Sequence, residues 1–164
     1  MSKRAVITGI YGMDASTLAE YLLSLNYDVY GVYRRSSVGN IDTNIANIRK
    51  HPMLHLIEGD IGDSAFVNKL VSELKPDEYY GLAAQTFVHQ SFVAPLETMR
   101  INTEAVLIQL EAIRNFSPKT KFYNAASSEI YGGVSCPDTG YTELSQHYPR
   151  SPYGVSKSAA FFLT

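Results

Sequence analysis

The chain has 164 residues, of which 45% are hydrophobic and 18% charged, and its formal net charge is −2. This composition is typical of a globular domain with a sizeable core, and it offers neither the basic surface of a nucleic-acid-binding protein nor a polybasic membrane patch. With a single cysteine the chain has no intrachain disulfide and no cysteine-only metal cluster, and its apolar runs are too short for a membrane span or a signal-peptide core, so we expect a cytoplasmic protein.

A strand, a glycine turn and a helix are predicted at the start of the chain. Ala5–Thr8 is a short apolar run rich in β-branched residues, and residues 16–25 have apolar positions at helical spacing. Between them, Gly9 permits a tight turn, Gly12 lets the backbone approach a pyrophosphate, and Ala15 still allows close packing of helix on strand. The pattern indicates a dinucleotide-binding loop, and a plain strand–turn–helix is the alternative.

The second predicted strand, residues 28–33, is followed directly by two arginines. At this position of a dinucleotide-binding fold, an acid binds the ribose 2′-hydroxyl, whereas an arginine accommodates a 2′-phosphate. The segment Arg34, Arg35 and Ser36 contains no acid, so it favours NADP over NAD as the cofactor. A solvated basic turn is the alternative.

A third strand is predicted over 54–57, and its carboxyl end is where an adenine would be held. Asp60 and the backbone of Ile61 stand at that position. A helix is predicted over 64–75, with Asp63 as its N-cap.

Two further strands and a long helix complete the predicted sheet. The strands cover 77–84 and 121–126, and small residues at the end of the first leave room for the edge of a cofactor. The helix between them, over about 96–115, is apolar on more than one face, so part of it is expected to meet a partner subunit. Strands that alternate with helices indicate an α/β fold, a Rossmann-like doubly wound parallel sheet of five strands in one domain over 1–164.

Tyr153 and Lys157 are four residues apart, so they share one face of the helix predicted after the loop at 133–152. A phenol has an unperturbed pKa of about 10, and an ammonium group one turn away favours the phenolate and lowers that pKa. The pair can therefore act in proton transfer. An exposed helix with an incidental Tyr and Lys is the alternative.

Several motifs coincide in chain order, and together they resemble the extended short-chain dehydrogenases that act on nucleotide sugars, most closely the GDP-mannose 4,6-dehydratase family. The segments that carry the resemblance are Ile7–Gly12, Tyr21–Leu23, Gly31–Ser37, Gly59–Asp60, Leu82–Gln85, Ser127–Gly132 and Tyr148–Lys157. The arginine segment after the second strand and the Pro-Arg-Ser-Pro-Tyr-Gly segment favour this dehydratase over an epimerase.

The resemblance implies a role for four residues. Ser127 would steady the sugar 4-hydroxyl, and Tyr153 would take its proton while a hydride passes from C4 to NADP. Glu129 would remove the proton at C5 and help to expel the C6 hydroxyl as water, after which the hydride returns to C6. Lys157 would support Tyr153 and hold the nicotinamide ribose. An exposed acid at a strand end is the alternative for Glu129.

The resemblance also implies a set of binding residues and a GDP-mannose substrate. The open edge of the sheet and the apolar helix surface predict a homo-oligomer, and we expect no metal and neither nucleic acid nor membrane as partner. The cofactor-binding residues would be Thr8, Gly9, Tyr11, Gly12, Met13, Asp14, Arg34, Arg35, Ser36, Asp60, Ile61, Leu82, Ala83, Ala84, Tyr153 and Lys157. The substrate-binding residues would be Gln85, Ser91, Ser128 and Glu129.

This chain departs from the family pattern at several positions and in length. Met13 stands where the family usually has Gln, Ala15 where it has Gly, Gly81 where it has Asn, and Ser127 where it has Thr. Family members are considerably longer, and their second half carries most contacts to the GDP moiety, so we expect a fold that lacks the C-terminal substrate domain. Two alternatives therefore stay open: an NADP-binding or nucleotide-binding module without turnover, and an epimerase or reductase for another nucleotide sugar.

Overall fold

The computed structural model describes residues 2–35, 44–133 and 140–164. The chain forms two compact units, and each is described by itself. The sheet unit consists of Met1–Ala83 and Ile108–Ala125, and the helical unit consists of Ala84–Leu107 and Ala126–Thr164. The single domain expected over 1–164 stays a prediction.

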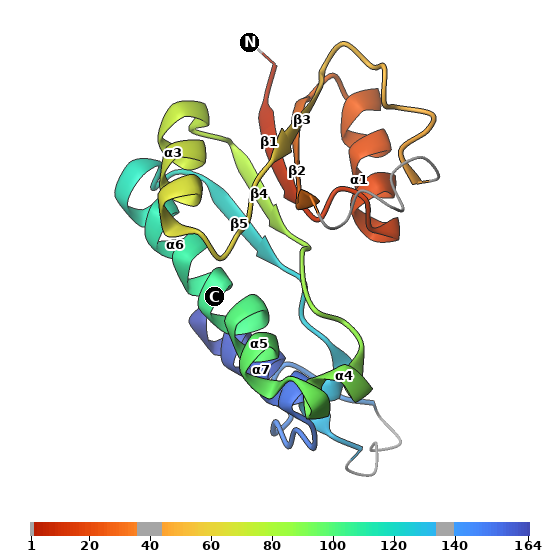
Figure 1. Ribbon diagram of the computed structural model, residues 1–164, viewed down its shortest axis with the longest axis vertical. Helices are drawn as coiled ribbons and strands as arrows, with labels where there is room; N and C mark the ends of the chain where they lie inside the picture. Colours follow the sequence, from red (N-terminus) through yellow and green to blue (C-terminus); the bar gives the residue numbers. More distant parts are fainter. Residues whose placement is uncertain (1, 36–43, 134–139) are drawn as a thin grey trace. The chain divides into compact units, whose positions relative to one another are not determined.

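The sheet unit contains a five-stranded sheet in the order β3-β2-β1-β4-β5, with every pair of neighbours parallel (Figure 1). The strands are β1 (Arg4–Thr8), β2 (Asp28–Tyr33), β3 (Leu54–Glu58), β4 (Glu78–Gly81) and β5 (Lys121–Asn124). The strand order runs outward from β1 in both directions, which is the arrangement of a doubly wound dinucleotide-binding sheet. The predicted Rossmann-like α/β fold is confirmed.

Helices cover both faces of the sheet, as Figure 1 shows. They are α1 (Met13–Ser24) on one face, and α3 (Ser64–Leu74) with α6 (Ala105–Phe116) on the other. Side chains alternate along β1, so Ala5 and Ile7 belong to the core under α1, whereas Val6 belongs to the core under α3 and α6. All three side chains are fully buried, as expected for a strand that is covered on both faces.

The predicted start of α3 is confirmed in detail. Asp63 is its N-cap, and the Asp63 carboxylate accepts hydrogen bonds from the amides of Ala65 (2.9 Å) and Phe66 (3.3 Å). These amides have no partner within the helix, so the cap stabilises its first turn.

The fourth strand is shorter than the predicted 77–84, and that predicted end was wrong. β4 ends at Gly81, because the next two backbone amides donate hydrogen bonds to a side chain of β1 and not to the backbone of a neighbouring strand. Thr8 Oγ1 accepts hydrogen bonds from the amides of Leu82 and Ala83, each at 3.0 Å. Likewise β5 ends at Asn124, two residues before its predicted end.

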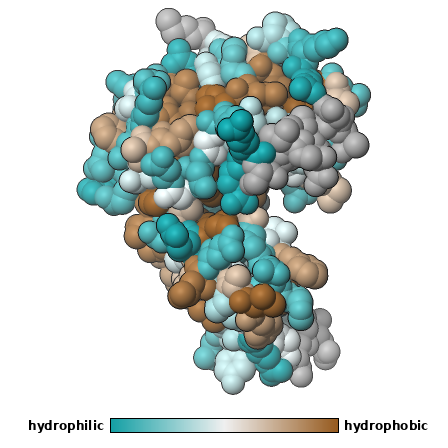
Figure 2. Space-filling view, viewed as in Figure 1, coloured by the Kyte–Doolittle hydropathy of each residue, from teal (hydrophilic) through white to brown (hydrophobic). Residues whose placement is uncertain are grey.

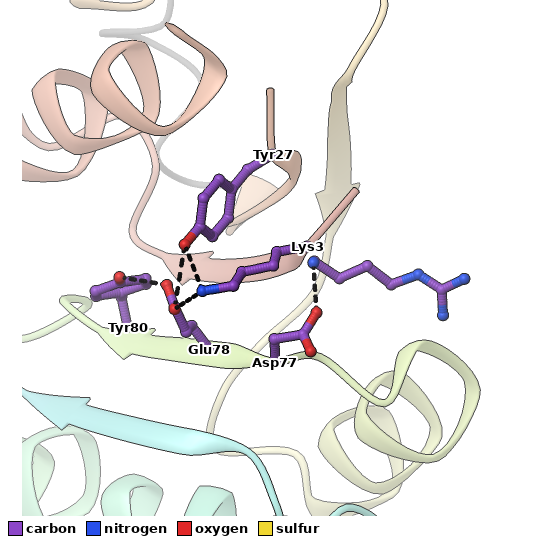
Figure 3. A network of polar contacts seen from close by, with 6 residues as sticks. Lys3, Tyr27, Asp77, Glu78 and Tyr80 are labelled. Carbon is purple, nitrogen blue, oxygen red and sulfur yellow. Dashed lines mark hydrogen bonds and ion pairs between the residues drawn. The ribbon is translucent and has the colours of Figure 1, made fainter. Parts of the chain in front are cut away.

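A polar network lies on β4 near the start of β1 (Figure 3). The Glu78 carboxylate accepts hydrogen bonds from the hydroxyls of Tyr80 (2.8 Å) and Tyr27 (3.2 Å), and Lys3 Nζ lies 3.6 Å from it. Burial, followed by the hydrogen bond to Glu78, raises the pKa of Tyr80 above its usual value. The network joins the segment before β2 to the middle of the sheet.

The helical unit is organised around its last helix, α7, which contacts α4, α5, η2 and η3. Its elements are α4 (Val88–Val93), α5 (Pro95–Met99), η2 (Arg100–Glu104), η3 (Ser128–Tyr131) and α7 (Pro152–Leu163). The long helix predicted over about 96–115 is present as α5, η2 and α6 in succession. η2 is a π-helical segment, a wider turn that the sequence pattern did not indicate.

Candidate functional site

The turn after β1 is shaped by one buried hydroxyl and one glycine. Thr8 is fully buried and binds two amides that follow β4. Gly9 has φ of +71°, and a side chain there would place its Cβ 3.0 Å from the Ala83 backbone. The turn therefore requires glycine for both its conformation and its close approach to the strand beside it.

The N-terminus of α1 follows this turn. Gly12 is the N-cap residue, and as a glycine it has no side chain that could cap the helix. Met13 and Asp14 are exposed in the first turn, whereas Ala15 is buried against the sheet unit's core. Tyr11 is also buried, and its ring lies 5.1 Å from that of Tyr33 at the end of β2. The first-turn amides can therefore receive an anionic group.

The residues predicted for the adenosine end follow two neighbouring strands. Arg34 and Arg35 are exposed directly after β2, and Tyr33, at the end of that strand, is paired in register with Glu58 of β3. Asp60 is exposed after β3, and its carboxylate accepts a hydrogen bond from the Gly62 amide at 2.8 Å. Because the carboxyl ends of parallel strands meet at one edge, these side chains share that edge of the sheet.

The remaining residues predicted to bind the cofactor differ in burial and in the unit to which they belong. Ile61 is buried next to Asp60. Ser36 lies outside the described residues. Ala84 belongs to the helical unit, whereas Leu82 and Ala83 belong to the sheet unit.

The two residues of the predicted proton-transfer pair lie on α7, as the four-residue spacing requires. Ser151 caps this helix, because its hydroxyl accepts a hydrogen bond from the Gly154 amide at 2.9 Å, and Pro152 occupies the first turn. Tyr153 and Lys157 are 7% and 6% exposed. Burial lowers the pKa of the Lys157 ammonium group below its usual value, because a charged group loses hydration there.

The Ser127–Glu129 turn packs against the start of α7. Ser127 is the N-cap of η3, and its hydroxyl accepts a hydrogen bond from the Glu129 amide at 3.3 Å. A Cβ on Gly154 would lie 2.8 Å from the Glu129 carbonyl oxygen, and a Cβ on Gly132, where φ is +61°, would overlap the Tyr148 carbonyl. Two glycines thus permit the contact that brings Ser127 and Glu129 to the helix of Tyr153.

Two of the predicted substrate-binding residues, Gln85 and Ser91, form hydrogen bonds within the helical unit, and the other two are exposed. Gln85 Nε2 donates to the Phe87 carbonyl at 3.0 Å, and within the described part of the chain Gln85 Oε1 is buried without a hydrogen-bond partner. Ser91 is fully buried and donates to the Val88 carbonyl at 2.6 Å, so it stabilises α4 internally. Ser128 and Glu129 are exposed.

One buried residue that the sequence pattern did not single out joins these parts. Asn102 lies in η2, and its Oδ1 accepts from the Gln85 amide at 2.9 Å. Its Nδ2 donates to the Gln85 carbonyl at 3.0 Å and to Ser156 Oγ at 3.1 Å, and Ser156 Oγ donates to the Tyr153 carbonyl at 2.7 Å. Asn102 therefore positions both Gln85 and α7. A signal was present, since a polar residue in an apolar helix needs a partner.

Groups of three or more His, Cys, Asp or Glu side chains that could hold a metal ion are absent from residues 2–35, 44–133 and 140–164. Within the same ranges, every helix is too short or too polar to cross a bilayer.

Residues 6–164 match the family model described as GDP-mannose 4,6 dehydratase. The GDP-mannose 4,6-dehydratase of Vibrio cholerae is 41% identical to this chain over 99% of the chain and 45% of its own length. The chain belongs to the GDP-mannose 4,6-dehydratase family.

Solved structures have the same fold over nearly the whole chain. Pal from Bacillus thuringiensis matches with a TM-score of 0.89 at 25% identity, over 98% of this chain and 50% of its own. WbmH from Bordetella bronchiseptica, solved in complex with NAD+, matches with a TM-score of 0.83 at 25% identity, over 99% of this chain and 52% of its own. The chain spans about half the length of the curated relatives it matches.

Proposed function

We propose that this chain is an NADP-dependent nucleotide-sugar dehydratase that converts GDP-mannose to GDP-4-keto-6-deoxymannose. The observation that carries the proposal is the contact of the Ser127–Glu129 turn with the start of α7, where Gly154 approaches the Glu129 carbonyl. It gathers a hydroxyl, a carboxylate, a phenol and an ammonium group in one unit of a chain that belongs to the dehydratase family.

The sheet unit offers groups that fit NADP. The uncapped N-terminus of α1 after Gly12 would receive the pyrophosphate, whose negative charge is favoured there. Arg34 and Arg35 would bind the 2′-phosphate, and the described residues that follow β2, 34 and 35, include no acid that would oppose it. NADP bound there would supply the hydride-transfer chemistry that the reaction needs at sugar C4 and C6.

The helical unit would carry out the proton transfers. Tyr153, with its phenol as base, takes the proton of the 4-hydroxyl, which the Ser127 hydroxyl holds in place. Burial lowers the pKa of the Lys157 ammonium group, and a phenolate one turn away would stabilise its charged form. Glu129 removes the C5 proton, which the 4-keto group has made acidic, and assists departure of the C6 hydroxyl as water.

Turnover separates this proposal from a binding module. A module without turnover is favoured by the short length of the chain relative to its relatives, and it would bind NADPH without forming product. We expect purified protein with NADP and GDP-mannose to form the 4-keto-6-deoxy sugar, and Tyr153→Phe to lower the rate by about 10²–10⁴-fold. Tyr148→Phe, at a tyrosine that is 55% exposed, is the matched control and should keep full activity. Bound NADPH with no product from the unaltered chain overturns the proposal in favour of the module.

Glu129 separates a dehydratase from a C4 epimerase or a reductase, because elimination at C6 needs a base at C5, whereas epimerisation or reduction at C4 does not. We expect Glu129→Gln to abolish dehydration, and Glu143→Gln, at another exposed acid of the helical unit, to leave it intact. Full activity of Glu129→Gln on a nucleotide sugar, without loss of water, would instead favour an epimerase or a reductase.

The proposal includes self-association. Large apolar side chains are exposed at the surface of the helical unit on and beside α4 and α5, and Figure 2 shows hydrophobic residues at the surface of the chain. They are Phe87 (67% exposed), Phe92 (60%), Val93 (67%) and Leu96 (80%). A second copy of the chain would remove this surface from water. Light scattering at micromolar concentration should give a dimer or a larger species, and a monomer contradicts this part.

A further inference from the structure

Met13 is unusually exposed for a methionine at a proposed binding loop. It is the first residue of α1, after the N-cap Gly12, and 75% of its surface is accessible. The other described methionines, Met53 and Met99, are half-buried. Its thioether is therefore the most accessible of the three to a dissolved oxidant.

The backbone around Met13 is fixed although the side chain is in solvent. The Met13 carbonyl accepts hydrogen bonds from Ser16 Oγ at 2.9 Å and from Thr17 Oγ1 at 3.0 Å. Ser16 is itself buried, so the first turn of α1 is held in place. Because side chains in a helix lean toward its N-terminus, the Met13 side chain is directed to the end of α1 where the first-turn amides lie.

We propose that Met13 is an oxidation site whose modification weakens dinucleotide binding. The proposal rests on the proposed function only in placing the pyrophosphate at the N-terminus of α1. A peroxide supplies the oxygen: its O–O bond breaks, an S–O bond forms, the sulfur loses two electrons, and hydrogen peroxide leaves as water. The product is methionine sulfoxide, and methionine sulfoxide reductases reverse the change.

The effect on binding follows from charge. A sulfoxide oxygen carries partial negative charge and accepts hydrogen bonds, so it competes with phosphate oxygens for the first-turn amides and repels them. Losing the interaction of a negative charge with a helix N-terminus lowers an affinity by about two- to fivefold. We expect a loss of NADPH affinity of that size when Met13 is oxidised.

The test uses the whole chain in a Cys136→Ser background, so that thiol oxidation does not contribute. Samples with and without Met13→Leu are treated with limiting hydrogen peroxide, and the sulfoxide at each methionine is measured by mass spectrometry of peptides. NADPH affinity is measured before and after treatment, and again after a reductase. We expect Met13 to oxidise faster than Met53 and Met99, and bound NADPH to slow it. Affinity should fall in the parent, return with the reductase, and stay constant in Met13→Leu.

Three results overturn the inference while NADPH still binds the untreated chain: unchanged affinity after complete oxidation of Met13, an equal loss of affinity in Met13→Leu, or slower oxidation of Met13 than of Met53 or Met99. No NADPH binding before oxidation overturns the proposed function together with this inference, so the two failures are distinguishable.

Discussion

The two units differ in what they bury. In the sheet unit, apolar side chains of β1 and β2 pack against α1, α3 and α6, whereas the helical unit buries mainly hydroxyls, amides and one ammonium group. The buried polar residues of the helical unit are Ser91, Thr98, Asn102, Ser151, Ser156, Lys157 and Ser158. Hydrocarbon cores tolerate small shifts of position, but hydrogen bonds in a dry interior fix direction and distance. The difference suggests that the sheet unit supplies stability and a binding surface, and that the helical unit supplies precise placement.

The largest effect is expected at Asn102, where the helical unit concentrates its hydrogen bonds. Asn102→Ala leaves the backbone of Gln85 and the Ser156 hydroxyl without their partner, which should lower the free energy of unfolding by about 2–4 kcal/mol. Asn102→Asp keeps the acceptor and loses the donor, so its effect should be intermediate. Asn115→Ala, at an exposed position of α6, is the control. Urea unfolding measures all three, and equal stabilities would show that the network is unimportant.

The sheet unit was largely predictable, and the helical unit only in part. The apolar β-branched runs at Ala5–Thr8 and 28–33 indicated their strands, and Asp63 indicated the start of α3, because period and capping are local signals. The spacing of Tyr153 and Lys157 indicated a shared helix face for the same reason.

What the sequence missed depends on contacts between distant residues. The end of β4 is set by Thr8, whose hydroxyl accepts hydrogen bonds from the amides of residues more than 70 positions away. The role of Asn102 depends on Gln85 and Ser156, which no local pattern connects, and no local pattern indicated the π-helical segment η2. The roles of the predicted site residues stay predictions until they are tested by substitution.

A smaller effect is expected at Thr8, whose buried hydroxyl shapes the turn after β1. Thr8→Val keeps the shape and removes the acceptor of two amides, so the free energy of unfolding should fall by about 1–3 kcal/mol and NADPH should bind more weakly. Thr86→Val, at an exposed threonine, should change neither quantity. A Thr8→Val chain as stable as the parent would contradict this explanation of the end of β4.

Lys157→Met should stabilise the helical unit in a pH-dependent way. Burial lowers the pKa of Lys157, so between that lowered value and the usual 10.5 the unfolded chain binds more protons than the folded chain. Raising the pH through this window therefore increases the free energy of unfolding of the parent. Lys157→Met lacks the titrating ammonium group, so its free energy of unfolding does not gain this contribution. We expect the variant to be more stable near neutral pH, and the gap to narrow as pH rises. Denaturant unfolding at several pH values checks it, and a gap that widens with pH contradicts it.

The smallest effect tests the hydrocarbon core of the sheet unit. Tyr79 is fully buried, and among the described residues its hydroxyl has no hydrogen-bond partner, so burial raises its pKa. Tyr79→Phe should therefore leave the free energy of unfolding unchanged or raise it by about 1 kcal/mol. Tyr80→Phe, at the next position, loses the hydrogen bond to Glu78 and should lower it by about 1 kcal/mol. Thermal unfolding should give a midpoint at or above that of the parent for Tyr79→Phe and below it for Tyr80→Phe, and a destabilised Tyr79→Phe would indicate a partner for that hydroxyl.

The central claim is that the sheet unit holds a dinucleotide while Tyr153, Glu129 and Lys157 of the helical unit carry out a complete dehydration. Incubation with NADP and GDP-mannose deuterated at C4, followed by mass spectrometry and NMR of the product, tests it most directly. The account predicts a 4-keto-6-deoxy sugar with the deuterium at C6 and no net formation of NADPH. Deuterium that accumulates in NADPH, or a chain that binds NADPH and leaves the sugar unchanged, would contradict it.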